Sequence, residues 1–208
     1  MLERITRRER SDLLIAWLAI SIAFSLIFIR GGVTVELFVT YLLVSMLTVG
    51  IGFILHEMAH KFTAMKYGFW AEFRKDNLML LVAVAMAALV GIVFAAPGAT
   101  VIYGGYISRE QNGKISAAGP AVNLLLCIPF ALILFVSGMI SMSFLSRNLL
   151  GLIGMVGLQV NAMIAAFNML PVSVLDGKKV LAWNPAVFAV LIIAAFGILL
   201  ASFSPAIF

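Results

Sequence analysis

Long apolar stretches separated by short polar segments make up almost the whole chain. Six stretches approach the roughly 20 residues with which a helix crosses the hydrocarbon core of a bilayer. They cover residues 13–29, 37–55, 78–96, 115–145, 149–175 and 185–203. Because the polar segments between them are short, little of the chain is left for a soluble domain. The pattern predicts an all-α, polytopic membrane protein.

The stretch that begins at residue 78 departs from this helical pattern. It starts as an apolar helix, Pro97-Gly98 interrupts it, and residues 99–107 are rich in β-branched and aromatic side chains. We therefore expect five spanning helices and a re-entrant hairpin over about 78–107, which enters as a helix and returns as a strand. Non-helical backbone at membrane depth must be covered by protein or line a watery cavity. Such a strand would lie beside a functional site and offer an edge to an unwound peptide.

The composition supports this membrane assignment and excludes a soluble globule. Of 208 residues, 63% are hydrophobic and only 11% are charged, which leaves too few polar groups to cover a water-soluble surface. No linker or internal repeat divides the chain, so we expect one domain over residues 1–208. The single Cys127 cannot form an internal disulfide. We interpret it as a small apolar helix residue, with metal ligation held in reserve.

The distribution of basic residues predicts the orientation of the first helix. The net charge is +5, but the 14 Lys and Arg residues lie in the short segments between apolar stretches. This favours the positive-inside pattern of multi-pass proteins over a nucleic-acid surface. Arg4, Arg7, Arg8 and Arg10 place the N-terminus in the cytoplasm of a cell-membrane protein. The first stretch lacks a small-residue cleavage pattern, so we expect a retained span rather than a signal peptide.

The topology after residue 78 has two alternatives. If residues 78–96 cross the membrane and nothing crosses back, four later basic residues lie outside. If residues 78–107 enter and return, the same four residues lie inside, and the positive-inside rule favours this return. The four are Arg109, Lys114, Lys178 and Lys179.

Both histidines of the chain lie in the pentapeptide His56-Glu57-Met58-Ala59-His60, at the end of the second apolar stretch. Four residues is slightly more than one helical turn, so both imidazoles face one side of a helix and can bind one zinc ion. Two unrelated surface histidines are the alternative, but ionisable side chains in a membrane segment are costly and usually mark a functional site. Glu57 lies beside the metal in this arrangement, which suits a base that acts on metal-bound water.

A hydrolytic zinc site needs a third protein ligand and an open position for water. The chain has no further histidine, so the ligand is a carboxylate or Cys127. The candidate carboxylates are Glu36, Glu72, Asp76, Glu110 and Asp176. Asp176 stands out because it follows a long apolar stretch, where Pro171 and Gly177 break the helix and give the aspartate freedom to turn inward. From spacing alone, an ordinary turn at Asp176-Gly177 is an equal alternative.

Three asparagines lie within apolar stretches. For Asn161 we expect a hydrogen bond between helices, which is the usual role of such amides. Asn123 lies one turn into a helix that we expect Gly119-Pro120 to open. Asn168 lies eight residues before Asp176 and could project toward the same cavity, where an amide donor would stabilise a developing oxyanion.

Three motifs, taken in order, resemble those of the site-2 protease family of intramembrane zinc metalloproteases. The pentapeptide from His56 to His60 is similar to the family's HExxH, and Gly119-Pro120-Ala121-Val122-Asn123 is similar to its GPxxN. The third motif is similar to the family's NxxPxxxLDG. It runs from Asn168 to Gly177 and includes Pro171, Leu175 and Asp176. The resemblance covers about residues 50–180, and we place the catalytic core at about 36–180.

The resemblance implies a role for each motif residue. His56, His60 and Asp176 would bind one zinc ion per chain, Glu57 would be the catalytic base, and Asn168 would contact substrate or transition state. It also implies cleavage of single-span membrane proteins within or near the bilayer, with a strand-like element that presents the substrate.

The chain departs from the family pattern at two places. The segment between His60 and Gly119 is longer and more apolar than the family's short hairpin, and Lys178-Lys179 follow Gly177 where a glycine and an arginine are usual. The sequence has no PDZ or CBS module, so gating or nucleotide regulation through such modules is not expected.

The sequence therefore predicts a zinc-dependent intramembrane endopeptidase whose partners are single-span membrane proteins and the lipid bilayer. A divalent-metal transporter or channel is the alternative, because intramembrane His, Asp and Asn also line ion pathways. A transporter would place ligands at several depths or in repeated halves, and the sequence has neither a second histidine cluster nor an inverted repeat. The presence of Glu57 disfavours an inactive scaffold.

Overall fold

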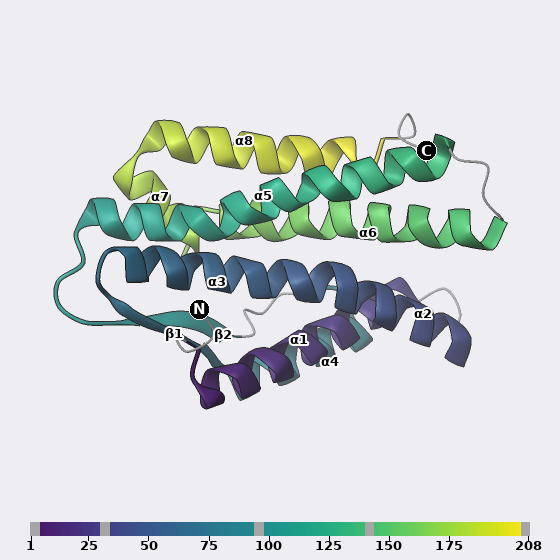
Figure 1. Cartoon of the computed structure of the whole chain (residues 1–208), viewed down its shortest axis with the longest axis horizontal. Helices are drawn as coiled ribbons and strands as arrows, with labels where there is room; N and C mark the ends of the chain where they lie inside the picture. The colour runs from purple at the N-terminus through teal and green to yellow at the C-terminus, as the bar shows by residue number, and fades with distance from the viewer. Residues whose placement is uncertain (1–4, 30–33, 94–97, 140–143, 205–208) are drawn as a thin grey trace. The chain divides into compact units, whose positions relative to one another are not determined.

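The computed structural model describes residues 5–29, 34–93, 98–139 and 144–204. The chain divides into two compact units, Met1–Gly104 and Gly105–Phe208. The first unit contains α1 (Arg7–Phe28), α2 (Val35–Ser45), the π-helical segment η2 (Met46–Gly50), α3 (Ile51–Lys66), β1 (Trp70–Lys75), α4 (Asn77–Leu89) and β2 (Gly98–Tyr103) (Figure 1). The second contains α5 (Arg109–Met139), α6 (Phe144–Asn168), α7 (Asp176–Trp183) and α8 (Pro185–Ala201).

Four helical segments of the described chain are long and apolar enough to cross a membrane. They are Arg7–Phe28, Val35–Lys66, Arg109–Met139 and Leu149–Asn168. The second of them comprises α2, η2 and α3, which follow one another without a break. The helices α4 and α8 are apolar but have only 13 and 17 residues, and 13 residues reach about 20 Å of the roughly 30 Å hydrocarbon core. A mostly helical, membrane-type chain is thus confirmed, and the number of five spans stays a prediction.

The helix α4 ends earlier than the apolar pattern predicts. The Met86 carbonyl accepts hydrogen bonds from the backbone N–H groups of Val90 and Gly91, both at 2.9 Å. Gly91 has φ +83°, a left-handed conformation that closes helices at little cost when the residue is glycine. Hydropathy does not indicate this end, because apolar residues continue beyond it. Pro97, where we expected the break, lies outside the described residues.

A two-stranded antiparallel sheet adds one strand to the single strand that the sequence predicts. The strand β2 confirms the predicted β-structure after residue 97, and its partner is β1, with Phe73 opposite Thr100. The strand β1 is not predicted by the sequence, because it lies in a charged segment between two apolar stretches. The alternation in β1 instead places Ala71 and Phe73 on a fully buried face, while Glu72 and Arg74 pair with each other on the other face. The re-entry of this hairpin into the membrane stays a prediction.

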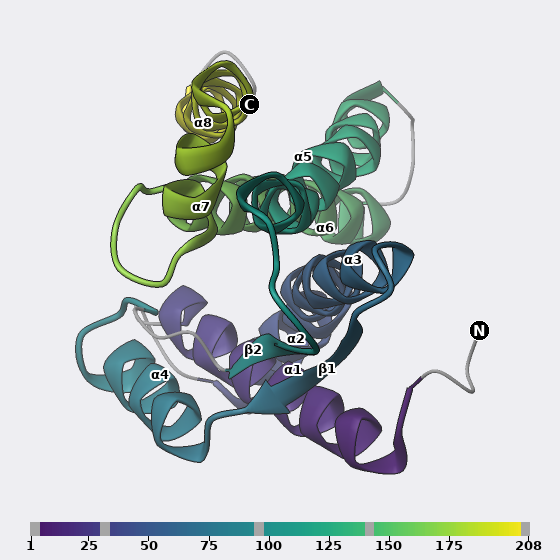
Figure 2. The ribbon, with the colours of Figure 1, turned by 90° about the vertical axis from the view of Figure 1, so that its left-hand side faces the viewer.

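The first unit is built around this sheet and α3. The sheet packs against α1 and α3, and α1 also packs against α2 and α4 (Figure 2). The Phe53 ring of α3 meets the Phe73 ring of β1 edge-on, with centroids 5.5 Å apart. Aromatic pairs favour this arrangement by about 0.5–1.5 kcal/mol beyond the area that they bury.

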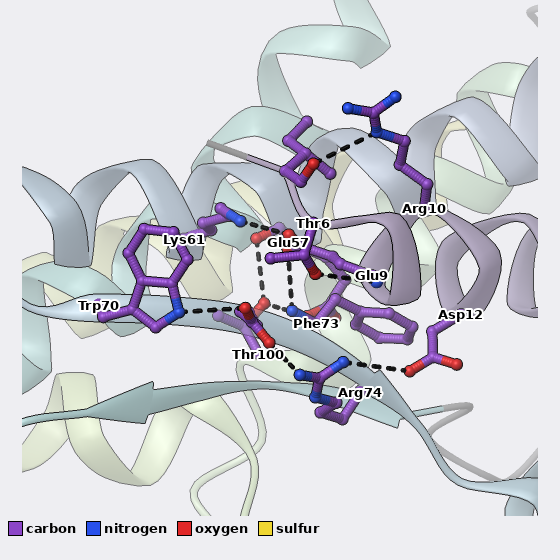
Figure 3. A network of polar contacts seen from close by, with 12 residues as sticks. Thr6, Glu9, Arg10, Asp12, Glu57, Lys61, Trp70, Phe73, Arg74 and Thr100 are labelled. Atoms are coloured by element: carbon purple, nitrogen blue, oxygen red, sulfur yellow. Dashed lines mark hydrogen bonds and ion pairs between the residues drawn. The ribbon is translucent and has the colours of Figure 1, made fainter. Parts of the chain in front are cut away.

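A buried ion pair joins three elements of the first unit. Lys61 of α3 pairs with Glu9 of α1, and both side chains are fully buried. The other carboxylate oxygen of Glu9 accepts the backbone N–H of Phe73 in β1 at 3.0 Å (Figure 3). Charges taken out of water destabilise a protein unless they are paired and hydrogen-bonded. The pair therefore fixes α1, α3 and β1 to one another, directly after His60.

The second unit is a group of four helices. The helix α5 packs against α6 and α7, and α8 also packs against both of these. The amide nitrogen of Asn123 donates to the amide oxygen of Asn161 at 2.9 Å, and Asn161 donates to the Gly157 carbonyl at 2.8 Å. The predicted interhelical role of Asn161 is thus confirmed. A side chain at Gly157 would meet the Phe130 ring at 2.2 Å, so glycine permits the close approach of α5 and α6.

The position of Gly119-Pro120 corrects a further prediction. The helix α5 begins at Arg109, so these residues lie inside a helix rather than at its start. Pro120 removes one backbone donor, yet the helix continues to Met139. The motif therefore does not open the helix that carries Asn123.

Candidate metal centre

The histidine pair lies on α3, which continues from a π-helical turn. At this turn the Trp17 indole of α1 donates to the Met46 carbonyl at 3.0 Å. Gly50 closes the turn, and a side chain there would meet the Trp17 ring at 2.0 Å. Single π-helical turns are often found at functional sites, because they change the face that the following residues present. Here α1 contacts the turn that precedes the histidines.

His56 and His60 lie on one face of α3, as their spacing predicts. Their Nε2 atoms are 3.0 Å apart, and the ring centroids are 4.6 Å apart at an interplanar angle of 84°. Both residues are buried. Two histidine nitrogens on a tetrahedral zinc ion, each about 2.0–2.1 Å from it, lie about 3.3 Å from each other. The pair therefore presents two nitrogens at the spacing of zinc ligands.

Glu57 is buried and faces the sheet. The hydroxyl of Thr100 in β2 lies 2.8 Å from Oε2 of Glu57 and 3.2 Å from its backbone oxygen (Figure 3). Phe53, one turn before Glu57, packs against β1. Lys61, one turn after Glu57, pairs with Glu9, which also accepts a backbone N–H of β1. The base predicted from the sequence thus lies on the sheet-facing side of α3. Thr100 is not predictable from the sequence, since nothing in the spacing of the chain places residue 100 beside residue 57.

Asp176 belongs to the second unit, where it is the first residue of α7. It is buried, and the Lys179 ammonium one turn later lies 3.8 Å from its Oδ1 atom. The first turn of a helix favours a carboxylate, because the backbone dipoles point their positive ends there. The predicted break after α6 is present, with Pro171 between α6 and α7.

Gly177 has a different role from the one that we predicted. It lies inside the first turn of α7 and does not break a helix. A side chain at this position would meet the Met169 carbonyl oxygen at 2.1 Å and the Leu170 carbonyl oxygen at 2.7 Å. Glycine therefore allows the start of α7 to approach the end of α6, and this approach sets the position of Asp176.

Replacing Gly177 with alanine is expected to destabilise the second unit by about 1–3 kcal/mol, the usual cost of overpacking. If Asp176 binds zinc as predicted, zinc retention should also fall, since Asp176 moves with its helix. Gly197→Ala is the matched control, because nothing lies within 4 Å of that position and alanine favours helix by about 1 kcal/mol. Thermal unfolding in detergent and zinc content measure both effects. Equal results for the two variants would contradict this role of Gly177.

The other candidate ligands have positions or contacts elsewhere in the fold. Glu36 is exposed in the first turn of α2, Glu72 accepts a hydrogen bond from Trp70, and Asp76 caps α4. Glu110 pairs with Lys114. Cys127 is buried in an apolar cluster with Leu158 and Ala162, which agrees with its interpretation as an apolar helix residue. The assignment of Asp176 as the third ligand stays a prediction.

Asn168 is the last residue of α6. Its amide nitrogen donates to the Ile164 carbonyl one turn earlier, at 3.0 Å. This bond holds the side chain along its own helix. A contact of Asn168 with substrate stays a prediction.

A buried histidine pair with an adjacent glutamate on one helix is typical of zinc metalloproteases. The chain is similar to a protein of Methanocaldococcus jannaschii named "Putative zinc metalloprotease MJ0611", with 38% identity over 197 residues and 95% of each chain covered. It belongs to the same family as that protein. No family model matches the chain, and no solved structure matches it.

Proposed function

We propose that this metalloprotease is an intramembrane endopeptidase of the site-2 protease type, which cleaves single-span proteins within or near the bilayer. One observation carries the proposal. The helix with His56, Glu57 and His60 is part of a continuous apolar segment, Val35–Lys66, that is long enough to span a membrane. A soluble protease has no need to place its ionisable catalytic groups on such a segment, where they are costly.

We further propose that His56, His60 and Asp176 bind the zinc ion. Two imidazoles and one carboxylate form a donor set typical of hydrolytic zinc sites, which keep a fourth position open for water. When bound there, zinc lowers the pKa of a coordinated water toward about 7 and polarises a carbonyl.

Glu57 serves as the general base in this proposal. Its carboxylate takes the proton from the attacking water and returns it to the amine of the leaving peptide. The side chain is buried, and its hydrogen bond with Thr100 holds one of its two oxygens. The other oxygen can then receive the proton.

We propose that the substrate adds as a strand to the outer edge of β2. The outer edge of β1 is less suited to this role. At its centre the Phe73 N–H, which points away from β2, already donates to Glu9. Peptide recognition at a sheet edge uses main-chain hydrogen bonds, so it requires an unwound segment but little sequence identity. A helix-breaking site in an apolar segment would meet this requirement.

A pair of synthetic single-span peptides tests the proposed function. One carries an Asn-Gly pair in the middle of its apolar segment, and the other has Leu-Leu there. We expect the purified protein in detergent to cleave the first peptide faster, with the cut inside the apolar segment when mapped by mass spectrometry. Chelation should stop cleavage and added zinc should restore it.

Three outcomes would contradict the proposal. They are no cleavage by fully zinc-loaded protein, cuts confined to the soluble flanks, and zinc uptake by proteoliposomes without any cleavage. The last would favour the transporter alternative.

A further inference from the structure

Thr100 is placed to orient the catalytic base. Its hydroxyl oxygen is 2.8 Å from the Glu57 carboxylate and 3.2 Å from the Glu57 backbone carbonyl. A hydroxyl carries one proton, so it can donate to only one of these acceptors at a time. Hydrogen bonds to ionised acceptors are shorter and about twice as strong as neutral ones. The carboxylate is therefore the favoured acceptor.

The backbone around Thr100 is fixed to the same helix that carries Glu57. Thr100 lies opposite Phe73 in the sheet, and the Phe73 ring packs against Phe53, one turn before Glu57. The Phe73 N–H donates to Glu9, which pairs with Lys61, one turn after Glu57. The sheet is thus attached to α3 on both sides of the base, as Figure 3 shows for Lys61, Phe73 and Thr100.

We propose that Thr100 is a positioning residue, which holds one carboxylate oxygen of Glu57 so that the other is aimed at the attacking water. The inference rests on the proposed function. It also connects two parts of that function, because the strand that we propose to receive the substrate is the strand that orients the base. A displacement of β2 would therefore change the position of the Glu57 carboxylate, because a hydrogen bond from Thr100 connects the two.

Three substitutions separate this role from a structural one. Thr100→Val keeps the shape and the β-branch, which suits a strand, but removes the donor. Thr100→Ser keeps the donor. Thr40→Val is the matched control, since the Thr40 hydroxyl donates to the backbone oxygen of Glu36, on an exposed part of α2.

With the Asn-Gly peptide as probe, we expect Thr100→Val to lower kcat about 10-fold or more, the usual effect of losing a hydrogen bond to a charged group. KM should stay within about 2-fold, since the backbone edge of β2 is unchanged. Thr100→Ser and Thr40→Val should retain most of kcat. Zinc content should be the same in all variants.

A second measurement does not require proteolysis. The infrared carboxylate stretch of Glu57, identified by its loss in Glu57→Gln, should shift in Thr100→Val and not in Thr100→Ser. Unchanged kcat and an unshifted band in Thr100→Val, or equal damage by the serine variant, would overturn the inference. If the native protein cleaves no probe at full zinc loading, the proposed function fails, and the infrared band still decides whether Thr100 holds Glu57.

Discussion

Replacing Glu57 with glutamine is expected to lower kcat by about 10²–10⁴-fold, the usual contribution of a general base. The amide has nearly the same shape but cannot accept a proton from water. Zinc content should be unchanged, because Glu57 faces β2 and its hydrogen bond is to Thr100 rather than to the histidines. Cleavage of the Asn-Gly peptide and metal analysis of the same preparation measure both quantities.

Glu36→Gln provides the control for this result. Glu36 is an exposed glutamate on the same continuous helical segment, so the chemical change is identical but the site differs. We expect native activity from this variant. If Glu57→Gln were as active as Glu36→Gln, the carboxylate would have no part in the reaction, and the assignment of the base would be wrong.

Replacing Asp176 with asparagine is expected to weaken zinc binding by more than about 100-fold, since loss of groups that merely support a ligand already costs 10–100-fold. Asparagine keeps the size of the side chain but removes its charge. Competition with a zinc chelator of known affinity measures the change. Activity should be lost in parallel and recover in part at high zinc concentration.

Asp76→Asn is the matched control for the metal ligand. Asp76 accepts the backbone N–H groups of Leu78 and Met79 at the start of α4, and asparagine caps helices as well as aspartate does. Its zinc affinity should therefore equal that of the native protein. If Asp176→Asn also retained native affinity, the third ligand would have to be another residue.

The apolar pattern predicted the helices better than it predicted their ends. A run of apolar residues marks where a helix can be buried in lipid, but Gly91 ends α4 through its backbone conformation, which hydropathy does not detect. The apolar pattern did not predict the strand β1 for a related reason. Its charged residues, Glu72 and Arg74, do not follow the apolar pattern, although they pair with each other on one face of the strand.

The candidate site was predictable where its residues are close in sequence. The spacing of His56 and His60 fixes their common face, since both lie on one helix. Contacts between distant elements were not predictable from spacing. Thr100 reaches Glu57 only because β2 pairs with β1, and Gly177 matters because α7 starts against the end of α6. These contacts depend on tertiary packing, so they required the structure.

The ion pair of Glu9 and Lys61 has a consequence for biosynthesis. The two residues are 52 positions apart, so the beginning of the first helix leaves the ribosome before the lysine does. Until then its carboxylate lacks the lysine partner, and placing it unpaired in the hydrocarbon would cost several kcal/mol. We therefore expect the beginning of the first helix to remain at the membrane–water interface during translation. It would settle into the bilayer together with the helix that brings the ammonium group.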